Sequence, residues 1–317
     1  MASTAVDILR QLVSVPSVNP RLAASGDPAG GEMGLTNWLD DFCGAAGWAR
    51  TRQVVHPGRS NLIALIPGGR GDTLLWEAHQ DTVSGEGMSV DPFAATVREG
   101  RVYGRGACDV KGAMAAMLAA LTRAAAQPLP GRPNILFASS VNEECGFTGA
   151  RALADLWRTD DAAAQHPNIE LSGAGGPSLE ELRALRPSAA IVAEPTDLNV
   201  VVAHRGVVRW QCTAHGRAAH SSRPEDGANA VYAMARVVRL IEDFHRIELA
   251  SRPIDPLCGS STACVTTMHG GRGANTVPDC AVIDVDRRLA PAELPQAAYD
   301  ELIAYLADRA ELGDCRL

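Results

Sequence analysis

Apolar residues in the first two hundred positions alternate between helical and strand-like spacing. Between residues 4 and 13 they recur at positions 6, 9, 12 and 13, which predicts a helix, and residues 35–42 and 111–126 are also predicted to be helical. Short apolar runs predict strands at residues 61–66, 73–78, 134–139 and 189–193. This alternation predicts an α/β domain in which helices cover both faces of a mixed sheet.

The pattern changes near residue 200. Strand-like segments follow at 207–214, 263–268 and 281–289, with predicted helices at 227–244 and 295–309. A β-α-β-β-α order of this size predicts a separate, smaller α+β domain. We therefore place a larger domain at residues 1–203 and a smaller one at residues 204–317.

The composition argues against two classes of function. The chain has 317 residues, a net charge of −8 and an isoelectric point near 5.5, so no nucleic-acid partner is expected. Its longest apolar run, residues 113–121, is far shorter than the roughly 20 residues that cross a bilayer, so no membrane partner is expected either. The N-terminus does not resemble a signal peptide, and the eight cysteines form no C-x-x-C pair, so we expect a cytoplasmic protein with ordinary thiols.

A histidine and an aspartate follow the strand predicted at 73–78. In "WEAHQDTV", residues 76–83, His79 and Asp81 lie two positions apart, so their side chains would project from the same face of the strand. This motif alone leaves two interpretations open. The pair is either a metal ligand with its partner or a polar pair that ends a strand.

Carboxylates occupy similar places elsewhere in the first domain. "GRGACDVKG" places Asp109 before a helix, "SSVNEECG" ends a strand with Glu143 and Glu144, and "IVAEPTD" ends another with Glu194. Ligands of open α/β sheets bind beyond the carboxyl ends of strands, so these groups are expected to converge. One imidazole with several carboxylates suits zinc or a similar divalent ion. Of the adjacent glutamates, one would bind the ion and the other would act as a base.

Each motif has a simpler explanation when it is taken alone. An Asp after Gly commonly caps a helix, a Glu-Pro pair commonly lies in a loop, and paired glutamates are commonly solvated. Their joint placement favours the metal site. A phosphate loop is excluded because "GRGACDVKG" lacks the G-K-[ST] order, and there is no G-x-S-x-G elbow of a serine hydrolase.

Seven ordered motifs resemble the M20 metallopeptidase family, which includes acetylornithine deacetylase, succinyl-diaminopimelate desuccinylase, aminoacylases and glutamate carboxypeptidases. The resemblance covers nearly the whole chain, and it implies a zinc-exopeptidase-like catalytic domain with a smaller lid. The motifs are "HQD", "GRGACDVKG", "NEECGFTGA", "AEPTD", "AAHSSRPEDGANA", "GGRGANTVPD" and "DRRLAPAE".

The resemblance implies a site for two zinc ions, with Co²⁺ or Mn²⁺ as substitutes. His79 and Glu194 would bind one ion, Asp109 would bridge both ions, and Glu144 would bind the second. Asp81 would orient His79, in keeping with the usual hydrogen bond between a ligand histidine and a carboxylate.

The resemblance also implies the remaining roles. Glu143 would be the general base. The smaller domain would be a lid through which a homodimer forms, and its His220 would stabilise the oxyanion in the active site of the partner subunit. Asn275 and Arg288 would hold the substrate, with Arg288 suited to clamp a carboxylate.

Family members continue from the lid into a segment that supplies a final zinc-binding histidine, whereas this sequence stops at "ELGDCRL". We therefore expect a truncated member of the family. The predicted reaction is hydrolysis of an amide bond in a small N-acyl amino acid, as in acetylornithine deacetylase or succinyl-diaminopimelate desuccinylase. The alternatives are a dipeptidase or carboxypeptidase of the same family, and an incomplete chain that acts only as a dimerisation module.

Overall fold

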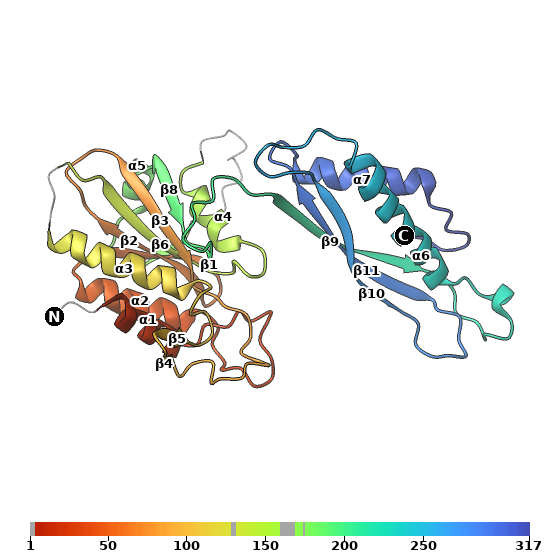
Figure 1. Ribbon diagram of the computed structural model, residues 1–317, viewed down its shortest axis with the longest axis horizontal. Helices are drawn as coiled ribbons and strands as arrows, with labels where there is room; N and C mark the ends of the chain where they lie inside the picture. Colours follow the sequence, from red (N-terminus) through yellow and green to blue (C-terminus); the bar gives the residue numbers. More distant parts are fainter. Residues whose placement is uncertain (1–3, 128–130, 159–168, 174) are drawn as a thin grey trace. The chain divides into compact units, whose positions relative to one another are not determined.

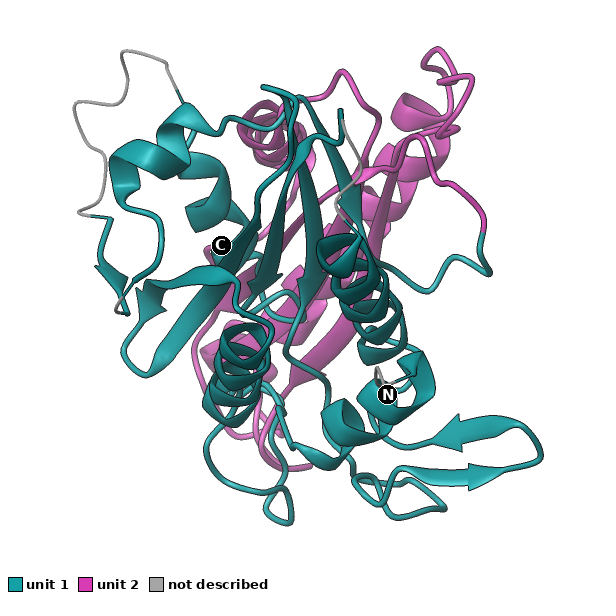
Figure 2. Cartoon of the chain, turned by 90° about the vertical axis from the view of Figure 1, so that its left-hand side faces the viewer, with its two compact units in different colours: residues 1–198 teal, residues 199–317 magenta. Residues whose placement is uncertain are grey.

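The structure, a computed structural model, describes residues 4–127, 131–158, 169–173 and 175–317. The chain divides into two compact units, residues 1–198 (unit 1) and residues 199–317 (unit 2), which Figure 2 shows in different colours. No helix within the described residues is long and apolar enough to cross a membrane.

Unit 1 is built on a six-stranded mixed sheet with the strand order β7-β1-β2-β6-β3-β8 (Figure 1). Strands β6, β3 and β8 run parallel, while the β7-β1, β1-β2 and β2-β6 pairs are antiparallel. The carboxyl ends of the three parallel strands therefore lie at the same edge of the sheet. The strands are β1 (Ala49–His56), β2 (Arg59–Ile66), β3 (Thr73–His79), β6 (Asn134–Ser140), β7 (Leu171–Ser172) and β8 (Ala189–Val192).

Helices cover both faces of this sheet because successive strand residues point to opposite sides. Along β2, Leu62 and Ala64 belong to one hydrophobic core and Ile63 belongs to another. The first core includes α1 (Ala5–Ser14), α2 (Met33–Ala45) and α3 (Lys111–Ala126), and the second includes α4 (Thr148–Asp155) and α5 (Leu179–Ala184). The predicted fold class, a mixed sheet with helices on both faces, is confirmed.

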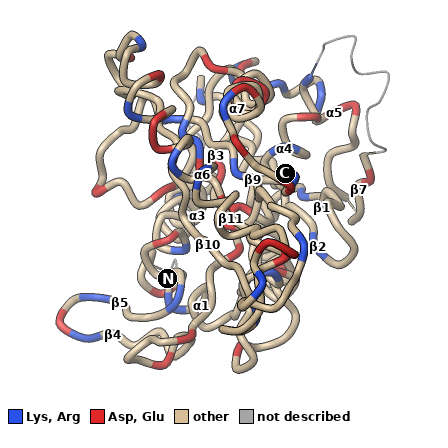
Figure 3. The backbone as a smooth tube through the Cα atoms, turned by 90° about the vertical axis from the view of Figure 1, so that its right-hand side faces the viewer, with Lys and Arg blue, Asp and Glu red and all other residues tan. Residues whose placement is uncertain are grey.

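A two-stranded hairpin, β4 (Thr96–Arg98) and β5 (Arg101–Tyr103), stands apart from the main sheet. Both strands carry basic residues, and the acidic Glu99 lies between them (Figure 3). Basic and acidic residue positions are likewise interspersed along the rest of the described backbone (Figure 3). The negative net charge of the chain is therefore spread over many elements rather than concentrated in one.

Unit 2 is the smaller α+β unit, an antiparallel sheet in the order β10-β11-β9 with two helices in its core (Figure 1). Its elements are β9 (Gly206–His215), α6 (Ala230–Asp243), β10 (Thr262–Gly270), β11 (Cys280–Leu289) and α7 (Pro295–Arg309), with a 3₁₀ turn at Pro224–Asp226 and a π-helical turn at Phe244–Leu249. The helix predicted at 227–244 begins at Ala230, because the Asn229 side chain caps it by accepting the N–H groups of Val231 and Tyr232 at 3.0 and 3.1 Å.

Strand β11 carries a charge into the core of unit 2. Its buried positions alternate, and Arg287 fills one of them with no solvent exposure. The Arg287 guanidinium pairs with Glu293 at 2.8 Å and lies over the ring of Phe244. Glu293 also accepts hydrogen bonds from the Ser261 hydroxyl and from the backbone N–H of Ala290. The buried cation is therefore compensated by a carboxylate that is itself held in place.

Candidate metal centre

Three polar motifs of unit 1 begin where adjacent parallel strands end. His79 is the last residue of β3, which lies between β6 and β8 in the sheet (Figure 1). Strand β6 ends at Ser140, shortly before Glu143, and β8 ends at Val192, two residues before Glu194. Parallel pairing therefore brings together side chains that are more than a hundred residues apart in the sequence.

His79, Asp109 and Glu194 form a cluster that fits a metal ion. One ligand atom from each residue lies within 4.8 Å of the other two, and Nε2 of His79 lies 3.0 Å from Oδ1 of Asp109. His79 is buried, whereas Asp109 and Glu194 are exposed. An imidazole nitrogen with carboxylate oxygens is a donor set that zinc accepts, so the residues present fit a divalent ion.

Asp81 contacts His79 through its backbone and the two glutamates through its side chain. Nδ1 of His79 lies 2.9 Å from the backbone oxygen of Asp81 and 3.7 Å from Oδ1. A carbonyl oxygen only accepts hydrogen bonds, so Nδ1 carries a hydrogen and Nε2 faces the cluster. The Asp81 carboxylate instead accepts the backbone N–H groups of Glu143 at 3.0 Å and Glu144 at 3.1 Å. The carboxylate thus positions the glutamate pair, a contact that the sequence did not reveal.

The environment of Glu143 raises the pKa of its carboxyl group towards neutrality. Burial raises the pKa of Glu143 to about 7, and the charges of Glu194 and Glu144 also raise it while His79 opposes them. Burial raises the pKa of Glu144 as well, and the charge of Asp109 adds to that effect. A carboxyl group with a pKa near neutrality is suited to accept and return a proton.

The same charges act on His79 in the opposite sense. Burial would lower the pKa of the imidazole, but the hydrogen bond to Asp109 and the charges of Asp81 and Glu143 outweigh burial and raise the pKa of His79 to about 9. The centre therefore has a negative potential that stabilises positive charge, as a cation site requires.

A buried polar layer lies behind the glutamate pair, and sequence reasoning missed it. Asn142, directly before Glu143, contacts the side chains of Asn19 and Arg59 and donates its backbone N–H to Glu32. The partners come from three distant segments and show no metal-ligand spacing. Asn19, Glu32 and Asn142 are polar residues that the structure shows to be buried, and their burial could not be read from the sequence.

The candidate residues of unit 2 lie at two separate places: His220 and Asn275 are in the segments that follow β9 and β10, and Arg288 is in β11. His220 forms an isolated antiparallel β-bridge with Thr276, and the backbone oxygen of Asn275 accepts the N–H of Ser221 at 3.0 Å. Arg288 lies near the far end of β11, roughly 25 Å from the start of that strand at about 3.3 Å per residue. Its guanidinium pairs with Asp286 at 2.7 Å. Unit 2 therefore brings His220 and Asn275 together and keeps Arg288 apart from them.

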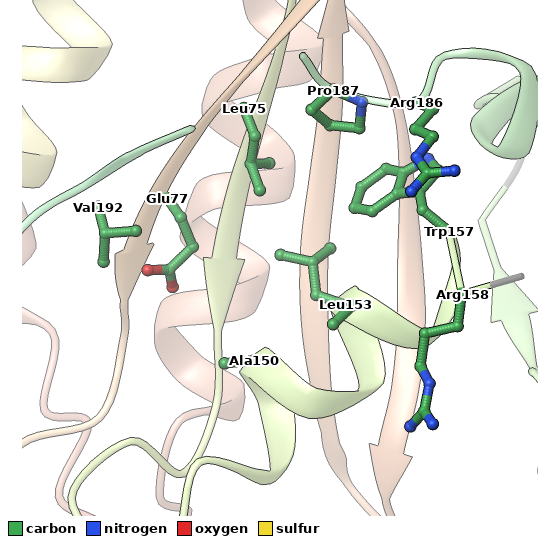
Figure 4. A pocket seen from close by; sticks show the side chains of 10 residues that line it. Leu75, Glu77, Ala150, Leu153, Trp157, Arg158, Arg186, Pro187 and Val192 are labelled. Carbon is green, nitrogen blue, oxygen red and sulfur yellow. The ribbon is translucent and has the colours of Figure 1, made fainter. Parts of the chain in front are cut away.

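A separate cavity of about 530 Å³ opens beside β3, β8 and α4 (Figure 4). Its lining is mainly apolar and includes Leu75, Ala150, Leu153, Trp157 and Val192. Glu77 also lines it, and this carboxyl accepts a hydrogen bond from the Ser140 hydroxyl at 2.6 Å while burial raises its pKa. Because His79, Asp109 and Glu194 do not line this cavity, it is distinct from the metal cluster.

Comparison with known proteins places this arrangement in a family. Residues 75–312, more than half of the chain, match the sequence model of peptidase family M20/M25/M40. The acetylornithine deacetylase of Proteus mirabilis (strain HI4320) is 30% identical over 311 residues, which cover 96% of this chain and 72% of that protein.

Two solved structures share the fold. An M20 family metallo-carboxypeptidase from Sulfolobus solfataricus aligns with a TM-score of 0.70 at 16% identity, over 99% of this chain and 77% of that one. The YXEP protein of Bacillus subtilis, a dinuclear metal-binding peptidase of the M20 family, aligns with a TM-score of 0.58 at 15% identity, over 98% of this chain and 71% of that one.

Proposed function

The chain belongs to peptidase family M20/M25/M40 and is thus a metal-dependent hydrolase, and on that premise we propose that it removes the acyl group from a small N-acyl amino acid, as acetylornithine deacetylase does. The observation that carries the proposal is the meeting of His79, Asp109 and Glu194 at the end of the parallel strands. The similarity to an acetylornithine deacetylase over nearly the whole chain supports the choice of substrate.

We assign the metal-binding roles to four side chains. His79 and Glu194 would hold one zinc ion, Glu144 would hold a second, and Asp109 would serve both. The cluster distances support the first ion, and the dinuclear centre of the Bacillus subtilis relative supports a second. Ions bound there would polarise the scissile carbonyl and activate the attacking water. Cobalt or manganese would suit the same donors.

Glu143 is the general base in this proposal. Its carboxylate takes a proton from the attacking water and later returns that proton to the nitrogen of the leaving amine. Two observations support the assignment: its pKa is raised to about 7, and its backbone is fixed by the hydrogen bond to Asp81. The adjacent Glu144 is held by the same carboxylate, so the base and the metal ligand keep a constant spacing.

Unit 2 completes the site in a homodimer. We assign oxyanion stabilisation to His220 acting in the partner's active site, and substrate binding to Asn275 and Arg288. Arg288, near the end of β11, lies far from His220 and Asn275, so the three side chains of one unit cannot contact the same small substrate. In the dimer, Asn275 would therefore act with His220 in the partner's active site, and Arg288 would act in the other site. The Arg288 guanidinium, already paired with Asp286, has the geometry to clamp a substrate carboxylate.

The proposal is tested by measuring zinc content and turnover on a panel of substrates. N-acetylornithine, N-succinyl-diaminopimelate and a set of dipeptides should be compared at equal enzyme concentration. Preferred turnover of N-acetylornithine, lost on chelation and restored by zinc, is the expected result. Preference for dipeptides would instead indicate a peptidase of the same family. Absence of zinc binding and of all turnover would contradict the proposed function and leave a dimerisation role.

A further inference from the structure

A single buried amide joins Asp81 to the turn that carries the two glutamates. Nδ2 of Asn19 donates to Oδ2 of Asp81 at 2.7 Å and to Oδ1 of Asn142 at 3.0 Å. We propose that Asn19 is a positioning residue that, through Asp81 and Asn142, fixes Glu143 and Glu144 at the metal centre. The inference rests on the proposed function and adds to it a residue outside every motif that suggested the site.

Both oxygens of the Asp81 carboxylate are used. Oδ1 accepts the N–H of Glu143 at 3.0 Å, and Oδ2 accepts both the N–H of Glu144 at 3.1 Å and the amide of Asn19 at 2.7 Å. Rotation of this carboxylate would therefore break bonds to both glutamates. The amide of Asn19 opposes that rotation, and Asp81 is buried, so water does not compete for the same oxygen.

Asn142 forms the other half of the link. Its backbone has φ 62°, a left-handed conformation that Asn tolerates better than most residues. Its Oδ1 accepts from Asn19 and from Arg59, each at 3.0 Å, and its Nδ2 donates to the hydroxyl of Thr148 at 2.9 Å. Because two donors face the oxygen, the orientation of the Asn142 amide is fixed. The turn before Glu143 is thereby held on both sides.

Asn19 is itself fixed by its own chain segment. Its backbone N–H donates to the carbonyl of Thr82 at 2.8 Å, and its Oδ1 accepts the N–H of Arg21 at 3.1 Å. With its oxygen occupied, the side chain presents only N–H groups to Asp81 and Asn142. An aspartate at position 19 would keep the acceptor for Arg21 but would place a negative charge against Asp81.

Asn19 contacts none of the proposed metal ligands directly. Its loss should therefore change the geometry of the centre while every ligand remains present. Residues that support metal ligands from behind typically contribute 10- to 100-fold to metal affinity or activity. For Asn19→Ala we expect a fall of about 10- to 100-fold in zinc affinity and in kcat, with KM nearly unchanged.

The test combines three measurements on the full chain. Zinc affinity is measured by competition with a chelating dye, ligand geometry by the visible absorption bands of the cobalt-substituted protein, and folding by thermal unfolding of the metal-free protein. The variants are Asn19→Ala and the similarly sized Asn19→Asp. The control is Asn134→Ala, which removes the hydrogen bond from the Gly68 N–H at the opposite end of β6.

In both Asn19 variants we expect weaker zinc binding and altered cobalt bands. In Asn134→Ala we expect the wild-type cobalt spectrum, even where its loss of thermal stability equals that of the Asn19 variants. Wild-type affinity and spectrum in a folded Asn19 variant would overturn the proposal. Unfolding of both Asn19 variants would also overturn it, because the role of Asn19 would then lie in folding. Failure of the wild-type protein to bind zinc would refute the proposed function instead.

Discussion

Nε2 of His79 lies 3.0 Å from Oδ1 of Asp109, although 30 residues separate them in the sequence. His79 ends β3 and Asp109 lies in the turn before α3, so the contact joins a strand end to a helix start. Because Nδ1 of His79 donates to the Asp81 carbonyl, a second hydrogen on Nε2 that points to Asp109 makes the imidazole a cation, and a metal ion between the two atoms would supply the same positive charge. The same nearby carboxylates raise the pKa of His79 and provide the oxygen donors of the proposed metal centre.

The shared role of Asp109 predicts different metal contents for two variants. Asp109→Ala should lose both zinc ions, because this carboxylate is proposed to bridge them, whereas Glu144→Ala should lose only the second. Metal content after dialysis, measured by mass spectrometry, distinguishes the two. Equal loss in both variants would contradict the bridging assignment.

Glu143→Ala should abolish hydrolysis and leave zinc binding largely intact. The loss of proton transfer should lower kcat by about 100- to 10,000-fold, the usual contribution of general acid–base catalysis. Steady-state kinetics and metal content are measured on the same preparation, with Glu143→Gln as the variant of similar size. Loss of zinc together with activity would show that Glu143 is a ligand rather than the base.

His220→Ala should lower kcat by about 100- to 1000-fold without changing metal content, as expected for a lost oxyanion contact. The sharper test mixes this variant with Glu143→Ala after dissociation and reassembly. Each mixed dimer would hold one site with an intact Glu143 and an intact His220 from the partner subunit, so about a quarter of the wild-type activity should return. No recovery in a mixture shown to contain mixed dimers would rule out the cross-subunit role.

Removal of Glu293 should destabilise unit 2. Glu293→Ala removes the carboxylate nearest to the buried Arg287, and breaking such a buried pair typically costs about 3 to 5 kcal/mol. The control is Glu242→Ala, because Glu242 is exposed and pairs with Arg239 and Arg246 on the surface of unit 2, where a pair is worth less than about 1 kcal/mol. Urea denaturation with hydrogen exchange at β11 measures both variants, and similar losses would argue against an uncompensated buried charge.

Unit 2 should also lose stability in acid. Burial would raise the pKa of Glu293, but hydrogen bonds from Ser261 and the Ala290 N–H, with the charge of Arg287, outweigh burial and hold the pKa below its ordinary value of 4.5. A lowered folded-state pKa gives stability that is complete above the unfolded pKa and is lost as the pH falls through the folded one. Unfolding free energy measured below pH 4.5 should therefore fall more steeply in the wild-type protein than in Glu293→Gln, and parallel curves would contradict this.

Sequence patterns predicted the elements whose apolar spacing is strong. Residues 111–126 and 295–309 are the helices α3 and α7, and the four strands predicted in unit 1 are present. Strand β1, "ARTRQVVH", was missed because polar residues with long side chains fill half of it. Helix α4 was missed because it is short, and its apolar residues are too few to show a period.

The cluster of His79, Asp109 and Glu194 follows from the places of their motifs in the sequence. His79, Asp109 and Glu194 each belong to a motif at an element boundary, and parallel pairing brings such boundaries together. The hydrogen bonds from Asn19 to Asp81 and Asn142 were not predictable, because no local sequence pattern indicates which buried polar side chains will contact each other when 62 or 123 residues separate them. Such contacts depend on the folded arrangement of several segments.

The single buried cation of β11 also determines how that strand can pair. Side chains alternate between the two faces, so a slip of one residue against β9 or β10 would turn Arg287 outward and bring Asp286 and Arg288 into the apolar core. Glu293 would then lose its contact with Arg287. The ion pair thus helps to specify the register of the three strands, because a shifted register would separate Arg287 from Glu293.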